Sequence, residues 1–345
     1  MTDLVRPTTV GPAPDEPEHL EATTDELEGL EAESASPSRM AMRRFIHHRA
    51  AIISLVTFVM IALVIILAPI TSRYDEIQRL PAVEKVDAAT GATTARSSYN
   101  APSSEAWMGT DDLNRDLYSR IIWGGRVSLF IGIAVALSAS IIGTIIGAVA
   151  GYRGGLIDDL LMRATDLFLA FPLLVTLLVL RNAFKEITWL GWIFGELNSI
   201  RFIVVLLSAV GWMGVARIVR GVVLSLKERE FVEAARALGA SNRRIILRHL
   251  IPNSLGPILV AMTTSVVGAI VAESTLSFFG YGVNPGEGKA SWGNLLSASK
   301  GAVQSGFWWI PLFPGVVFVV TILCINFIGD GLRDAFDPKQ DKGRT

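Results

Sequence analysis

Residues 50–70 read Ala50-Ala-Ile-Ile-Ser-Leu-Val-Thr-Phe-Val-Met-Ile-Ala-Leu-Val-Ile-Ile-Leu-Ala-Pro-Ile70, and none of them carries a charge. At a rise of 1.5 Å per residue, a helical run of this length is about sufficient to cross the ~30 Å hydrocarbon core of a bilayer. A second uncharged run, Phe307–Ile328, has the same character. The chain is 51% hydrophobic and 18% charged, with a mean hydropathy of +0.45, whereas soluble domains carry roughly 25% charge. The composition argues against a soluble globular enzyme and predicts an all-α integral membrane protein.

Six apolar runs predict six transmembrane helices. The second carries Gly143, Gly147 and Gly151 at four-residue spacing, which predicts a helix face that a neighbouring backbone can approach closely. The third and fourth runs are shorter than the ~20 residues of a full crossing, so they need flanking residues, and Asp166 and Arg217 are expected near the membrane boundary. The runs are Ala50–Ile70, about Val127–Tyr152, Leu167–Leu180, Phe202–Ala216, a run after Pro252 and Pro257 to about Ala272, and Phe307–Ile328.

The distribution of charge predicts the orientation. Residues 1–38 hold ten acidic side chains against one basic residue and few large apolar ones, so they are interpreted as a disordered acidic cytoplasmic tail. Residues 39–70 then form a basic flank and the first transmembrane helix, with the flank in the cytosol. Residues 71–120 form an extracytoplasmic loop, interpreted as a flexible linker, and residues 121–338 form a core domain with five further spans. Six spans place both termini in the cytoplasm and the protein in the cell membrane.

The segment from Glu230 to Asn253 joins the fourth and fifth spans within a basic, cytosolic loop of about residues 222–253. Its apolar positions Phe231, Ala234, Ala235 and Leu238 follow i, i+3, i+4, i+7 spacing, which predicts a short helix with a small apolar face. Gly239 is predicted to take the left-handed position that ends this helix, and a second helix over Arg243–Leu250 is predicted to stop at Pro252. From the residues alone, the segment is either an amphipathic connector on the membrane surface or a helix-turn-helix that docks on a partner.

The spacing of Glu233-Ala234-Ala235, Gly239 and Pro252 resembles the EAA loop of ABC importer permeases, although His249 and Ile251 depart from its usual Ile and Leu. Further stretches resemble the second, C-type permease of the dipeptide, oligopeptide and nickel branch of that family. Asn114, in the first of them, stands where the family usually has glycine. These stretches are Gly109–Asp116 with Ser119-Arg120 and Arg126–Leu129, Ala272–Gly280, Arg248–Asn253, and Gly329–Asp334 with Asp337-Pro338.

The resemblance implies a type I ABC importer transmembrane domain that forms half of a pathway for peptides or a similar small solute. It implies a second homologous permease, two ATP-binding subunits that hydrolyse ATP, and an extracytoplasmic solute-binding protein that docks on Thr71–Arg120 and Ser277–Gly306. The loop helix would dock in a groove of the ATP-binding subunit, where Arg243 and Arg244 either meet carboxylates or remain solvated. The residues implied in coupling are Glu233, Ala234, Ala235, Gly239, Arg243 and Pro252.

Missing motifs limit the alternatives. No G-x-x-x-x-G-K-[ST] phosphate loop occurs, so the chain is predicted to bind no ATP by that route and to be no enzyme. Cys324 is the single cysteine and the four histidines are scattered, so no metal site is predicted. No cofactor and no nucleic-acid partner are predicted either. An ion-coupled secondary transporter or a channel subunit remains as a rival class, and a passive membrane scaffold is a third class. Within the importer class, a permease for nickel or another non-peptide solute remains as an alternative. Glu273 is the candidate pathway residue, unless it lies hydrogen-bonded or wet near the outer interface.

Overall fold

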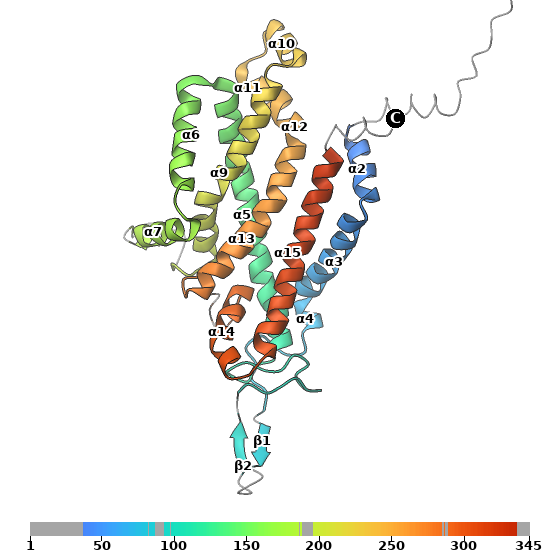
Figure 1. The fold of residues 1–345 in the computed structure, drawn as a ribbon, viewed down its shortest axis with the longest axis vertical. Helices are drawn as coiled ribbons and strands as arrows, with labels where there is room; N and C mark the ends of the chain where they lie inside the picture. Colours follow the sequence, from blue (N-terminus) through green and yellow to red (C-terminus); the bar gives the residue numbers. More distant parts are fainter. Residues whose placement is uncertain are drawn as a thin grey trace, which may run out of the picture.

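The computed structural model describes residues 37–81, 83–86, 93–96, 98–185, 187, 196–284, 286 and 289–336. Long helices run side by side along the long axis of the molecule, with a β-hairpin at one end and the short helix α10 at the other (Figure 1). We call these the hairpin end and the loop end. Positions 1–36 of the predicted acidic tail lie outside the described residues, and so does the C-terminal segment 337–345.

Among the described residues, five helices are long and apolar enough to cross a membrane. They confirm the predicted first, second, fourth, fifth and sixth spans. The second begins earlier than expected because Asp116 caps it, its Oδ2 accepting the Ser119 amide hydrogen bond at 2.8 Å. The sixth continues past Gly329 to Phe336. The five helices are α3 (Arg49–Ile66), α5 (Leu117–Arg153), α9 (Ile200–Leu226), α13 (Leu255–Phe278) and α15 (Trp309–Phe336).

The third predicted span is bent rather than straight. Helix α6 (Gly155–Leu169) and helix α7 (Leu173–Lys185) meet at an angle of 101° across a short break. Pro172 lies in this break, and proline disfavours helical geometry in the residue before it, here Phe171. A continuous crossing over Leu167–Leu180 is therefore wrong, and the count reaches six spans only if the bent pair is one span.

The glycines of α5 allow it to pack closely on α9, as predicted. A Cβ atom built on Gly147 would lie 2.4 Å from the carbonyl oxygen of Ala216, and one on Gly143 would lie 2.6 Å from that of Trp212. Real Cβ atoms never come this close to backbone oxygens. The two backbones therefore lie in direct contact, and α13 packs on both helices.

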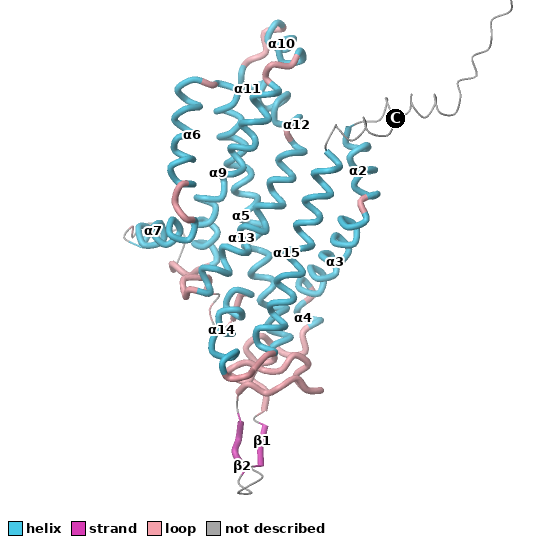
Figure 2. The backbone as a smooth tube through the Cα atoms, viewed as in Figure 1, coloured by secondary structure: helices cyan, strands magenta, loops and turns pink. Residues whose placement is uncertain are grey.

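The hairpin end is an ordered cap. Helix α4 (Ala68–Thr71) leads into it, and strands β1 (Val83–Val86) and β2 (Thr93–Arg96) pair antiparallel with Val83 opposite Arg96, projecting from it (Figure 1). Most loop segments gather here, beside α14 (Trp292–Gln304) (Figure 2). The Tyr99 and Phe307 rings stack at 4.4 Å. The flexible-linker interpretation is therefore wrong for residues 98–116, because aromatic packing and hydrogen bonds fix them, and the hairpin is an unanticipated addition to the helical fold.

Candidate functional site

The predicted helix-turn-helix forms at the loop end. Helix α10 (Glu230–Ala237) buries only Val232, while Phe231 is 39% and Leu238 88% exposed. The apolar face expected from the spacing of Phe231, Ala234, Ala235 and Leu238 therefore forms, and most of it is exposed to solvent. Exposed apolar side chains are not stabilised by water. The face is therefore suited to contact with another surface.

Gly239 ends α10 in the predicted left-handed conformation, with φ of +80°. The Gly239 N–H donates to the Arg236 carbonyl at 2.9 Å and the Ala240 N–H donates to the Ala235 carbonyl at 3.0 Å. This pair of bonds is a Schellman motif, which satisfies the last carbonyls of the helix. The turn is thus determined by backbone geometry, and no atom lies within 4 Å of where a Gly239 Cβ would be.

The second helix continues where a stop was predicted. Helix α11 (Asn242–Ile245) passes into the π-helical turn η1 (Ile246–Leu250), then α12 (Ile251–Asn253) and α13. Pro252 occupies the first turn of α12, a position where a helix tolerates proline, and a turn at Ser254 separates α12 from α13. The Ser254 N–H still donates to Leu250 across this point at 3.0 Å. The prediction that Pro252 stops the helix is therefore wrong, because the proline falls where a helix tolerates it.

Buried side chains hold the loop against the bundle. Val232, Ile245 and Leu250 are fully buried in one cluster with Val219 and Val223 of α9. Polar contacts add to this anchor at the end of α5. The Tyr152 hydroxyl donates to Asn242 Oδ1 at 3.0 Å, and the Arg236 guanidinium lies 5.3 Å from the Tyr152 ring centre. The loop is therefore rigidly placed while its outer face stays free.

The predicted coupling residues lie together on this loop. Glu233, Ala234, Gly239, Arg243 and Pro252 are exposed, and Ala235 is half-buried. Arg244 is exposed as well, beside Arg243. The sequence reasoning did not find Tyr152 and Asn242, since nothing in their spacing connects residues so far apart.

Two ion pairs join α6 to α9. The Arg220 guanidinium donates to both carboxylate oxygens of Asp158, at 2.5 and 2.6 Å, and Arg217 pairs with Asp166. The sequence placed Asp166 and Arg217 at a membrane boundary without pairing them. The signal in the sequence that could have predicted this pair was the opposite charge of the two residues, each beside a short apolar run.

Glu273 is fully buried in α13. Its Oε1 accepts hydrogen bonds from the hydroxyls of Ser277 and Ser291, each at 2.7 Å, so it ties α13 to the start of α14. This geometry favours the hydrogen-bonded alternative over contact with a solute. A pathway role for Glu273 stays a prediction.

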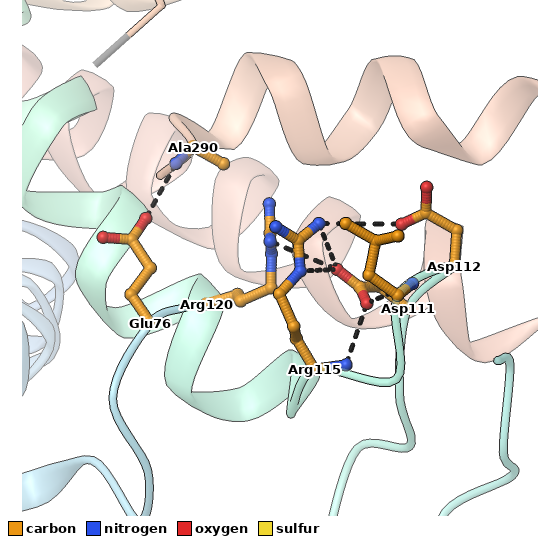
Figure 3. Close-up of polar contacts among 7 residues, drawn as sticks. Glu76, Asp111, Asp112, Arg115, Arg120 and Ala290 are labelled. Atoms are coloured by element: carbon orange, nitrogen blue, oxygen red, sulfur yellow. Dashed lines mark hydrogen bonds and ion pairs between the residues drawn. The ribbon is translucent and has the colours of Figure 1, made fainter. Parts of the chain in front are cut away.

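Buried charges also hold the cap together (Figure 3). Asp111 Oδ2 lies 2.8 Å from Arg115 Nη2 and 3.2 Å from Arg120 Nη1, at the start of α5. Glu76 Oε1 accepts the Ala290 N–H hydrogen bond at 2.7 Å, and burial raises the pKa of this carboxyl. Asn114 takes φ of +60° where the related motif has glycine, so the tight turn forms. Among the described residues, no group of three His, Cys, Asp or Glu could hold a metal ion.

A bundle of helices long and apolar enough to cross a membrane, with an exposed loop at one end, defines a polytopic membrane protein. Residues 143–342 match the family described as binding-protein-dependent transport system inner membrane component. Residues 36–85 match the N-terminal TM domain of oligopeptide transport permease C. The chain belongs to the first of these families, whose members are transport components rather than enzymes.

Relatives of known name cover almost the whole chain. The oligopeptide transport system permease protein OppC of Bacillus subtilis (strain 168) is 36% identical over 321 residues, covering 93% of this chain and 96% of the relative. OppC of Escherichia coli (strain K12) is 41% identical over 316 residues, covering 90% and 94%. The inward-facing MetNI methionine ABC transporter has a chain that aligns with a TM-score of 0.46 at 18% identity, covering 63% of this chain and 98% of that one. The matched family and the two OppC proteins argue against a secondary transporter or channel.

Proposed function

We propose that this chain forms half of a peptide-import pathway and couples it, through α10, to ATP hydrolysis on separate subunits. The observation that carries this proposal is an apolar α10 face that is exposed while the rest of its loop is anchored in the bundle. The named relatives, which are oligopeptide permeases, support peptides rather than nickel as the transported class.

The α10 surface fits a groove on an ATP-binding subunit. Phe231 and Leu238 supply apolar contact, and Ala234 between them leaves the helix narrow enough to enter a groove. Glu233 and Arg243 are exposed, where they can pair with opposite charges at the rim. The turn at Gly239 sets the direction of α10. Ala235 packs against the buried cluster that holds the loop, and Pro252 lies in α12, just before α13.

Contacts behind α10 transmit its displacement to the membrane helices. Tyr152 links α10 and α11 to the end of α5, and Lys227 Nζ donates to the Gly151 carbonyl at 3.3 Å. The Asp158–Arg220 pair then connects α9 to α6. A push on α10 would therefore reach three spans through direct contacts.

The two ends of the bundle face opposite compartments in this proposal. The loop end and both termini lie in the cytoplasm, because the basic residues concentrate around the loop. The hairpin end then faces outward, where residues 71–120 and 277–306 receive a solute-binding protein. A second homologous permease completes the pathway, and two ATP-binding subunits complete the importer.

Cysteine cross-linking tests the docking of α10. The native Cys324 is buried, so a Cys324→Ser background leaves engineered thiols as the reactive ones. Leu238→Cys should cross-link to the ATP-binding subunit, with a yield that changes when ATP is added. Val303→Cys in α14 is the matched control, since Val303 is also exposed, at 59%, and lies at the hairpin end. Equal cross-linking at both positions would contradict docking through α10.

Uptake by proteoliposomes tests the transported class and the energy source. The complete importer with its solute-binding protein should accumulate labelled peptides only when ATP is supplied to the cytoplasmic side. Labelled nickel should not compete. Uptake driven by a proton or sodium gradient without ATP would overturn the proposal.

A further inference from the structure

Helix α2 (Pro37–His47) lies at the loop end, outside the predicted spans and the coupling loop. It packs against the last turns of α15 (Figure 1). A Cβ on Gly331 of α15 would lie 3.1 Å from the Phe45 ring. The His48 side chain caps α3, accepting the Ala51 N–H at 3.1 Å, and its Nε2 lies 3.4 Å from Asp334 Oδ2. The elbow between α2 and α3 is therefore fixed to α15.

The side chains of α2 divide into distinct faces. Ala41 is buried and Phe45 half-buried against the bundle, one helical turn apart. Met42 and Ile46, the next positions round the helix, are 60% and 57% exposed. Arg43 lies beyond them and is exposed. The exposed apolar stripe thus lies between the packed face and a basic face.

Charge identifies the occupant of this surface. Residues 37–74 contain no Asp or Glu, whereas Arg39, Arg43, Arg44 and Arg49 fall within 11 positions of one another. Arg43 and Arg49 are both exposed. A cluster of arginines at the end of a membrane helix attracts anionic lipid headgroups, and guanidinium groups match phosphate geometry.

The helix that follows α2 also carries exposed apolar side chains. Ile53, Val56, Met60 and Leu63 of α3 are between 48% and 66% exposed in a helix that is apolar enough to span the membrane. Helix α2 precedes α3 directly and packs on the last turns of α15, and His48 and Ala50 just after it line a pocket with Asp330, Arg333 and Asp334. It therefore sits at headgroup level, with Met42 and Ile46 able to reach the acyl chains.

We propose that α2 is a binding surface for anionic phospholipid, in which Arg43 and Arg49 bind the headgroup phosphate while Met42 and Ile46 contact the acyl chains. This surface is independent of the peptide specificity and of α10 docking. It anchors the first span at one membrane face and holds α15 against it.

Native mass spectrometry of the purified full complex tests the proposal, with phosphatidylglycerol titrated into detergent micelles. Each arginine near an anionic lipid surface strengthens binding roughly fivefold, so Arg43→Gln/Arg49→Gln should weaken phosphatidylglycerol binding by about 25-fold. Arg43→Lys/Arg49→Lys should retain most of it. Arg126→Gln/Arg201→Gln, which removes two exposed arginines nearer the hairpin end, is the matched control and should bind as the wild type does. Equal loss in this control would overturn the proposal.

Further measurements distinguish anionic phospholipid from other ligands of the α2 surface. Met42→Ser/Ile46→Ser should also weaken phosphatidylglycerol binding, with all charges intact and the complex still assembled by size-exclusion chromatography. Displacement of the lipid by inorganic phosphate would reveal a plain anion site and refute a lipid surface. If the acidic segment 1–36 covered α2, binding would be insensitive to Arg43→Gln/Arg49→Gln and would rise only when that segment was deleted. That result would equally refute the proposal.

Discussion

Replacing Gly239 with valine should separate ATP hydrolysis from transport. Because no atom lies within 4 Å of the new Cβ position, the variant meets no clash, and its cost is the left-handed backbone itself. That cost is about 1–2 kcal/mol for a residue with a side chain. The population with α10 in its native direction should then fall roughly 5- to 30-fold relative to a relaxed turn.

The spans should be unaffected, since Gly239 touches none of them. The assay compares peptide uptake and ATPase activity stimulated by loaded solute-binding protein in proteoliposomes. We expect both to fall sharply in Gly239→Val, with normal amounts of assembled permease. Gly239→Asn is the matched control, because asparagine tolerates the left-handed region, and it should retain much of both activities. Wild-type uptake and wild-type stimulated hydrolysis in the valine variant would refute the coupling role of this turn.

Three further predictions concern the bundle and the cap. Gly147→Val should abolish folded protein on fluorescence size-exclusion chromatography, because its Cβ would meet a backbone oxygen at 2.4 Å, while Gly214→Ala, with open space around it, should fold normally. Asp158→Asn should lower thermal stability by about 1–3 kcal/mol by leaving the half-buried Arg220 without its charged partner, and an unchanged melting temperature would contradict this. The folded-state pKa of Glu76 is raised, so the cap should lose stability as pH rises above about 4.5, and Glu76→Gln, which keeps the acceptor, should remove this dependence of melting temperature on pH. A pH dependence unchanged in that variant would show that another group titrates.

The long spans and the α10 turn were predictable because each depends on a local property. Uninterrupted apolar length identifies α3, and the glycine spacing of α5 anticipates its contact with α9. Gly239 likewise follows from the end of a short helical pattern, since few other residues adopt its φ. Such features need only neighbouring residues to be recognised.

The remaining features depend on residues far apart in the chain. The cap forms because Tyr99 meets Phe307 and Glu76 meets Ala290, and no pattern within residues 71–120 specifies either partner. The bend between α6 and α7 had a local signal in Pro172, which the apolar run around it concealed. Pro252 gave the opposite error, because a proline stops a helix or begins one according to its position in the turn, and sequence alone leaves that position open.

Residues 242–278 run from α11 through the π-helical turn and α12 into α13, with only the turn residue Ser254 between the last two helices, and together they form a lever. At 1.5 Å per residue this lever is about 50 Å long, so a tilt of about 10° at one end would carry the other roughly 9 Å. Glu273, near its far end, is bonded to Ser291 at the start of α14. A small displacement of the loop would therefore arrive, magnified, at the opposite mouth of the bundle.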